Sequence, residues 1–162
     1  MSSTKVLEQA FSDISTNVIF TRRPDPIPGD LRTGWRLASL VLILQRCRGN
    51  TANLEQIHVL AWSVRSTQGR EVMRTWFSAR RKPNGLIIRH DPATSRTINL
   101  AVAAGLASRN DNASITLTGK GERLATLLWA NTEVLSREKE FLSTLPARIT
   151  QKSIDDLLEW RL

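Results

Sequence analysis

The sequence predicts a mainly α-helical fold with one short β-hairpin, and residues 86–120 are the main reason. Asp91 and Pro92 form a typical helix start, in which an N-cap residue is followed by proline at the first helical position. The helix is expected to cover residues 92–104, because Gly105 can adopt the positive φ that a helix C-terminus favours. Three β-favouring residues, 86–88, precede this helix and predict a short strand.

A two-stranded wing is expected directly after this helix. Residues 106–109 and 114–117 have the pattern of short strands on either side of the turn-forming segment 110–112. Thr118 can then cap a further helix, which opens with Gly-Lys-Gly-Glu. Strand, helix, wing and helix in this order are typical of the C-terminal half of a winged helix-turn-helix. We therefore predict a winged helix-turn-helix domain over residues 31–130.

Three helices are predicted in the N-terminal half of this domain. Residues 35–48 are apolar around most of the helix circumference, which indicates a central buried helix that ends at the following Gly-Asn pair. Asn53 can cap a second helix with one apolar face over residues 54–66. A third helix is expected over residues 68–81, before Pro83 stops it.

The segments on either side of this domain are expected to be appendages. Residues 1–30 contain a modest amphipathic helix followed by a proline-rich arm, whose prolines exclude both a helix interior and a central strand. Residues 131–162 are expected to form a helical C-terminal extension that binds a partner. Within it, Ser153 is expected to cap the last amphipathic helix.

One long helix is predicted to join the domain to this extension. Between residues 121 and 142, apolar side chains recur at a spacing of seven, which is typical of a helix with a continuous apolar seam. The domain is expected to bury the first turns and to leave the rest for a partner, although burial against the chain's own core is the alternative. The candidate partner-binding residues are Val134, Leu135, Phe141, Leu142, Leu157, Leu158 and Trp160.

The charge of the chain favours an anionic partner. The net charge is +8 and the sequence pI is near 11.0, a balance found most often in nucleic-acid-binding proteins, although a solvated basic face is the alternative. The second half of the helix over 92–104 is aliphatic, so non-specific contact with the phosphates of double-stranded DNA is favoured over base reading. The candidate phosphate-contacting residues are Arg74, Arg80, Arg81, Lys82, Arg89, Arg109 and Lys120.

The side chains of known catalytic and metal sites do not occur here in the required combinations. His58 and His90 are the only histidines and lie far apart in the sequence, and no Asp-x-Lys or Glu-x-Lys motif of restriction-type nucleases is present. Gly119-Lys120-Gly121 lacks the upstream glycine of a Walker motif. Cys47 is the only cysteine. We therefore expect a cytoplasmic binding protein without a metal, a cofactor or a membrane span.

Four stretches of the chain together are similar to a known family: LASLVLILQRCRG, LEQIHVLAWSVRS, IIRHDPATSRTINLAVAAGL and ITLTGKGERLA. With these stretches, which fall between about residues 31 and 130, the chain resembles the small middle component of three-component ABC-type bacterial conflict systems. These systems include Lamassu-type antiphage defence, whose small subunit belongs to this family.

The resemblance implies a role as well as a fold. In this family the subunit is a non-catalytic winged-helix adaptor in a hetero-oligomer. It joins a coiled-coil, SMC-like ATPase of the chromosome-maintenance type to an effector, commonly a nuclease. ATP hydrolysis and DNA cleavage would then belong to the partners. The first rival is a dimeric DNA-binding transcription regulator, and the second is an uncharacterised enzyme.

Overall fold

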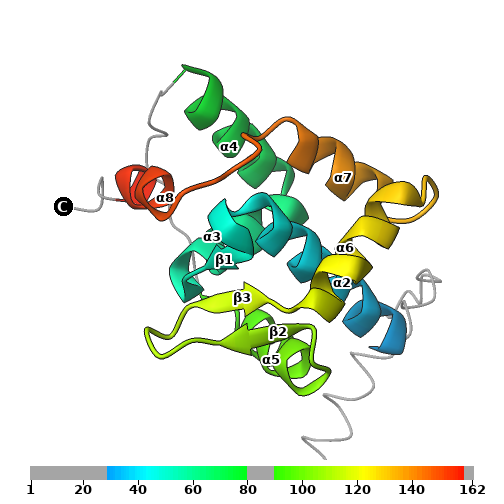
Figure 1. The fold of residues 1–162 in the computed structure, drawn as a ribbon. Coiled ribbons are helices and arrows are strands. Elements are labelled where there is room, and N and C mark those ends of the chain that lie inside the picture. Colours follow the sequence, from blue (N-terminus) through cyan, green and yellow to red (C-terminus); the bar gives the residue numbers. More distant parts are fainter. Residues whose placement is uncertain (1–28, 80–89, 159–162) are drawn as a thin grey trace, which may run out of the picture.

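The computed structural model describes residues 29–79 and 90–158. Helix α2 (Gly29–Arg46) crosses the middle of the molecule, and further helices pack around it (Figure 1). Residues 40–44 of α2 are buried on all sides, as expected for a helix that is apolar around most of its circumference. The predicted central helix is confirmed, although it begins at Gly29 instead of Trp35 and ends at Arg46.

Two short segments connect α2 to helix α3 (Leu54–Arg65). They are the 3-10 turn η1 (Arg48–Asn50) and strand β1 (Thr51–Ala52). The side chain of Asn53 accepts a hydrogen bond from the N–H of Gln56 at 2.7 Å, so the predicted N-cap of α3 is confirmed. Strand β1 is absent from the sequence prediction, because two residues are too few to show the alternation that marks a strand.

Helix α4 (Thr67–Ala79) packs against α3 and buries Met73 and Trp76. It confirms the predicted third helix as far as Ala79. The predicted strand over 86–88 falls in the segment 80–89, outside the described residues. The predicted N-terminal helix and most of the proline-rich arm also lie outside them, in residues 1–28.

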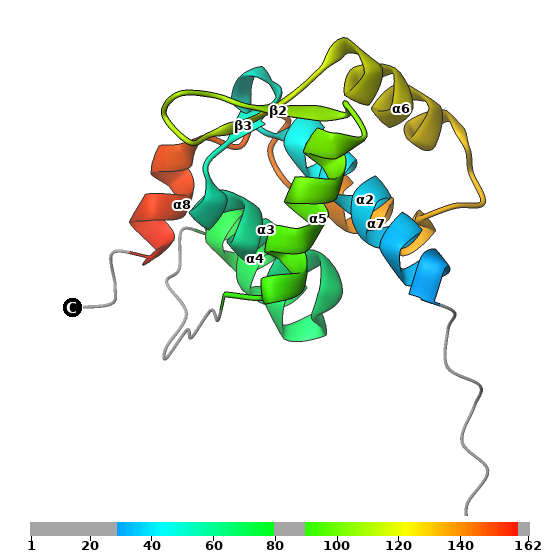
Figure 2. The same cartoon turned by 90° about the horizontal axis from the view of Figure 1, so that it is seen from below.

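Helix α5 (Pro92–Ala103) begins at the predicted residue and ends one residue before the predicted end. The Asp91 side chain caps its start by accepting a hydrogen bond from the N–H of Ala93 at 2.9 Å. Gly105 follows its last turn with a φ of +68°, a left-handed conformation that glycine adopts without strain. Figure 2 shows α5 lying alongside α2, against which it packs.

A hairpin of strands β2 (Ala107–Arg109) and β3 (Ile115–Leu117) follows α5 and confirms the predicted wing. Strand β3 is the middle strand of the sheet, because it pairs antiparallel with β2 on one side and with β1 on the other. Ile115 and Leu117 are buried while Thr116 between them is only half-buried, the alternation of a strand with one face on the core.

The predicted long helix over residues 121–142 is wrong. Helix α6 (Gly119–Ala130), capped by Thr118 as predicted, is followed by a separate helix α7 (Ser136–Ser143). The side chain of Asn131 accepts hydrogen bonds from the N–H groups of Glu133 at 2.8 Å and Val134 at 3.2 Å, which compete with continuation of the helix. Leu135 then adopts a positive φ of +54°. The chain therefore turns back, and α7 packs onto α2 and α3.

Helix α8 (Gln151–Leu158) adds to the same core. Its residues Ile154 and Leu157 are buried, and the helix packs on α3. The hydroxyl of Thr150 accepts a hydrogen bond from the N–H of Ser153 at 3.2 Å. The residue that caps the last helix is thus Thr150, and the prediction of Ser153 is corrected.

The described residues form a mainly helical fold with a small three-stranded antiparallel sheet. The element order, with β3 in the middle of the sheet, is compatible with a winged helix. None of the helices described is both long and apolar enough to cross a membrane.

Candidate nucleic-acid and partner-binding surfaces

The structure describes three of the cations predicted to contact phosphates: Arg74, Arg109 and Lys120. Arg109 and Lys120 are both exposed, and each is hydrogen-bonded to a residue in or just after the C-terminal half of α5. Lys120 Nζ donates to the carbonyl oxygen of Ala104 at 2.8 Å, and Arg109 Nη2 donates to Asn99 Oδ1 at 3.0 Å. Each cation keeps further N–H donors, so this edge can contact an anion. The other predicted cations, in residues 80–89, fall outside the described part of the chain: Arg80, Arg81, Lys82 and Arg89.

Arg74 lies elsewhere. Figures 1 and 2 both show α4 well separated from the β2–β3 hairpin. The guanidinium carbon of Arg74 is 5.8 Å from the centre of the Phe141 ring, a cation–π distance. Arg70 also faces this ring, and its Nη2 donates to the carbonyl oxygen of Val64 at 2.6 Å. Arg74 therefore occupies a surface separate from that of Arg109 and Lys120.

Most of the predicted partner-binding residues that the structure describes belong to the chain's own core. Phe141, Leu142 and Leu157 are buried, and Leu135 and Leu158 are partly buried against them. The reason is the turn at Asn131, which folds α7 back onto α2 and α3. The expectation that Leu135, Phe141 and Leu142 lie on an exposed seam is corrected. Val134 alone of the described set is exposed, at 41% of its surface, and Trp160 lies outside the described residues.

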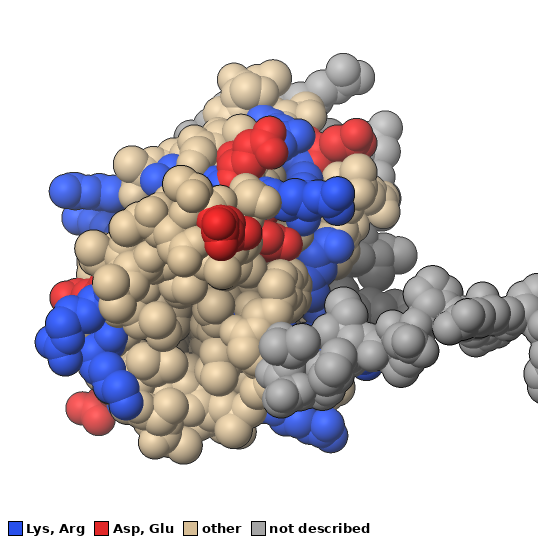
Figure 3. All heavy atoms as spheres, turned by 90° about the vertical axis from the view of Figure 1, so that its right-hand side faces the viewer, with Lys and Arg blue, Asp and Glu red and all other residues tan. Residues whose placement is uncertain are grey.

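The exposed apolar surface lies on α6 instead. Leu127, expected to be buried by the domain, has 67% of its surface exposed. The α6 residues Leu124, Leu128 and Trp129 are partly buried, and the helix packs against α2. Figure 3 views the molecule from the right-hand side of Figure 1 and shows a broad area without charged side chains, bordered by both basic and acidic side chains. We call this surface the α6 face and define it by Leu124, Leu127 and Leu128; the last two follow Leu124 by three and four positions and so share one side of the helix with it.

A cluster of ionisable side chains surrounds the start of α5. Asp91 Oδ2 accepts hydrogen bonds from Arg65 Nη1 and, at 3.3 Å, from Arg36 Nη1. The Asp91 N–H donates to Nδ1 of His58 at 3.4 Å, and the rings of His58 and His90 meet edge to face at 4.4 Å. Sequence analysis missed Arg36, because no local pattern relates side chains that are 55 positions apart.

Burial and neighbouring groups shift the pKa values of two residues in this cluster, Asp91 and His58. Partial burial alone would raise the pKa of Asp91, but hydrogen bonds from the Ala93 N–H and from Arg65 hold that pKa below its usual range. Burial, and next the neighbouring His90, lowers the pKa of His58, although Asp91 acts in the opposite direction. A neutral His58 is consistent with its Nδ1 accepting a hydrogen bond.

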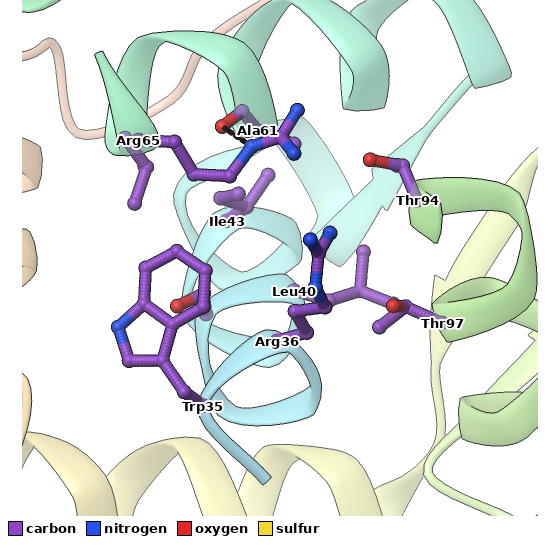
Figure 4. Close-up of a pocket in the computed structure, with 10 residues that line it drawn as sticks. Trp35, Arg36, Leu40, Ile43, Ala61, Arg65, Thr94 and Thr97 are labelled. Carbon is purple, nitrogen blue, oxygen red and sulfur yellow. Dashed lines mark hydrogen bonds between the residues drawn. The ribbon is translucent and has the colours of Figure 1, made fainter. Parts of the chain in front are cut away.

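A small pocket of about 30 Å³ opens beside this cluster, between α2, α3 and α5. Figure 4 shows Arg36 from α2 and Arg65 from α3 pointing toward the same space, with Thr94 of α5 opposite them. The walls are mainly apolar, and Trp35, Leu40 and Ile43 contribute to them. The pocket therefore combines an apolar interior with two guanidinium groups at its mouth.

Cys47 and the His, Asp and Glu side chains are the described residues relevant to thiol or metal chemistry. Among them, no group of three or more His, Cys, Asp or Glu side chains is placed to hold a metal ion. The Cys47 thiol is buried, and burial raises its pKa to about 12, so the reactive thiolate is scarce near neutral pH. Comparison of the chain with family models, with curated proteins and with solved structures finds no match.

Proposed function

We propose that this chain is a non-catalytic winged-helix adaptor subunit of an antiviral or anti-plasmid defence complex. It would join a coiled-coil, SMC-like ATPase to an effector such as a nuclease, and those partners would supply ATP hydrolysis and DNA cleavage. The observation that carries the proposal is the α6 face, where Leu127 has 67% of its surface exposed beside the partly buried Leu124 and Leu128. Apolar surface of this kind on a folded protein favours a protein partner.

The exposed side chains of α5 help to distinguish protein binding from DNA reading. In a winged helix that reads DNA, the helix before the wing presents polar side chains to base edges in the major groove. At the corresponding position, α5 exposes Leu100 at 47% of its surface, and Ala103 is also exposed. The exposed surface near the C-terminal end of this helix is therefore aliphatic at Leu100 and Ala103, which supports binding to protein there.

Contact with DNA phosphates is a secondary role within this proposal. Arg109 and Lys120 are exposed beside the C-terminal end of α5 and carry donors suited to phosphate oxygens. Ser95, Arg96 and Asn99 are also exposed on α5 and favour, as the second candidate, a dimeric DNA-binding regulator. Such a regulator would bind one preferred palindromic site as a symmetric dimer.

The adaptor proposal is tested by co-expression with the products of neighbouring genes. Leu127→Asp places a charge on the α6 face and is expected to abolish co-purification with an ATPase or effector subunit, while leaving the fold intact because Leu127 is largely exposed. Thr126→Asp is the matched control, since Thr126 is an exposed neighbour on the same helix. Undiminished assembly of the Leu127→Asp protein would overturn the proposed role of the α6 face.

A further inference from the structure

One carboxylate oxygen accepts hydrogen bonds from two guanidinium groups at the mouth of the pocket between α2, α3 and α5. Asp91 Oδ2 accepts from both Arg36 and Arg65, while Asp91 Oδ1 accepts from the N–H of Ala93. Two positive charges therefore meet one negative charge, which leaves an excess of one positive charge. A guanidinium group is best matched by a carboxylate that accepts two parallel hydrogen bonds, and neither arginine has such a partner among the described residues. Both arginines remain partly exposed, so their unused donors are accessible to a second carboxylate.

The pocket beneath these arginines suits a small aliphatic group. Its walls include Trp35, Leu40 and Val64. One hydroxyl in the lining, Ser39 Oγ, is buried without a hydrogen-bond partner in the described part of the chain, and Ser39 is 5% exposed. The volume of about 30 Å³ has room for about one or two methyl-sized groups. The pocket can therefore take the tip of an aliphatic side chain without rearrangement of its walls.

The size of the pocket also indicates what kind of molecule enters it. Burial of one or two methyl groups improves affinity by only about tenfold. That gain is too small to hold a free small acid against the entropy lost on association. An occupant must therefore be held by contacts beyond the pocket, as an anchoring side chain is in a protein interface. The net charge of +8 on the whole chain further favours an acidic partner.

We infer that this pocket is an anchor site for a partner polypeptide. An aliphatic side chain of the partner enters between α2, α3 and α5, and a neighbouring Asp or Glu of the same polypeptide binds Arg36 and Arg65 at the mouth. The inference rests on the proposed function only in requiring a protein partner. It concerns a surface separate from Leu127, so the two can fail independently.

The test uses a displayed library of random linear peptides, selected on the full-length protein. Peptides that also bind the Ala61→Leu protein are discarded, because Ala61 lines the pocket and leucine fills it. Ala79→Leu, at an exposed position of α4, is the matched control that should retain every selected peptide. We expect the remaining peptides to share an aliphatic residue next to Asp or Glu.

The carboxylate contact is measured on the selected peptides by fluorescence anisotropy. Replacement of the peptide's acidic residue by its amide, or Arg65→Gln in the protein, should each raise the dissociation constant about threefold, the order expected for a partly exposed ion pair. Made together, the two changes should raise the dissociation constant by less than the product of their separate fold-increases, because both remove the same contact.

Several outcomes would overturn the inference. The first is that every selected peptide also binds the Ala61→Leu protein. The second is that the pocket-dependent peptides lack an acidic residue. The third is that Arg65→Gln and Arg36→Gln leave the peptide affinities unchanged. The arginine substitutions keep the test decisive should Ala61→Leu fail to fold, because these side chains are partly exposed. Self-association of the full-length chain that Arg65→Gln abolishes would make the occupant a second copy, and would also overturn the inference.

Discussion

A Cβ atom on Gly121 would lie 2.0 Å from the carbonyl oxygen of Leu106. This contact sets the first turn of α6 directly against the chain that enters the wing. Because the oxygen belongs to the backbone, a side chain at this position would displace the hairpin. We expect Gly121→Ala to lower the free energy of unfolding in urea by about 3 kcal/mol. Gly34→Ala is the control, because a Cβ on Gly34 meets no atom within 4 Å, and it should stabilise α2 by about 0.5–1 kcal/mol. Equal effects at the two positions would show that the close contact is absent.

The C-terminal region is expected to be essential for folding. Phe141 is buried in the core around α2, and the guanidinium groups of Arg70 and Arg74 lie over its ring. Phe141→Ala should therefore destabilise the protein by about 3–5 kcal/mol, whereas Glu140→Ala at the exposed neighbouring position should change stability by less than about 0.5 kcal/mol. Deletion of residues 131–162 should abolish cooperative thermal unfolding measured by circular dichroism. A truncated chain that still unfolds cooperatively would show that α7 and α8 are dispensable.

Acidification is expected to destabilise the protein in two pH windows. The pKa of His58 is lowered from 6.5 by burial and by His90. The unfolded chain then binds the proton more tightly than the folded protein, so this stabilisation is complete above pH 6.5 and is lost as pH falls through the lowered pKa. The lowered pKa of Asp91 adds a second loss as pH falls below 3.8.

His58→Gln should remove the first window and leave the second. Urea unfolding at pH values on both sides of 6.5 measures this difference. The slope of unfolding free energy against pH near 6.5 should be the same in the His58→Gln and unaltered proteins only if His58 is not its source. Equal slopes would therefore exclude His58.

Cys47 is expected to be unreactive in the folded protein. Its thiol is 2% exposed as part of the core, it donates to the carbonyl oxygen of Ile43 at 3.3 Å, and its pKa is raised to about 12. Ellman's reagent should therefore modify Cys47 only after unfolding in urea, because the thiolate is the nucleophile. Ser95→Cys, at an exposed position of α5, provides a second thiol that should react at once without urea. Immediate reaction of the unaltered protein under folding conditions would contradict the burial of Cys47.

Charge-reversal substitutions test whether the cations of the hairpin region and of α4 differ in DNA binding. If Arg109 and Lys120 contact DNA phosphates, Arg109→Glu and Lys120→Glu should weaken binding equally for unrelated duplexes, and each should reduce the salt slope by about one. Arg74→Glu should leave that slope unchanged, because α4 lies away from the hairpin. The measurement is fluorescence anisotropy at several salt concentrations, with the isolated chain and with its assembled complex. A single preferred duplex, with the preference lost on Ala substitution of Ser95, Arg96 and Asn99, would favour the regulator over the adaptor.

Local hydrogen bonding made much of the helical structure predictable. Asn53, Asp91 and Thr118 each cap a helix through an N–H two or three positions later in the chain. Gly105 ends α5 through its own backbone conformation. Such features depend on neighbouring residues only, so the residue types at a few adjacent positions are sufficient to locate them.

The same local reasoning failed at Asn131. The spacing of seven between apolar residues is real, but a periodic pattern carries no information on whether a side chain will capture the N–H groups that the next helical turn requires. Asn131 does so, and the rows that were expected to form one seam are divided between an exposed Leu127 and a buried Phe141. The predicted seam is therefore not one continuous exposed surface.

The sequence by itself determined the caps, the hairpin, the buried central helix and the excess of positive charge, because each depends on composition or on contacts between near neighbours in the chain. Only the tertiary structure decided which apolar side chains stay exposed, that β1 completes the sheet, and that Arg36 and Arg65 converge on Asp91 over a pocket. These features arise from side chains that are far apart in the sequence. Their proximity follows from how the helices pack around α2, where the burial of apolar surface by the whole chain outweighs local preference.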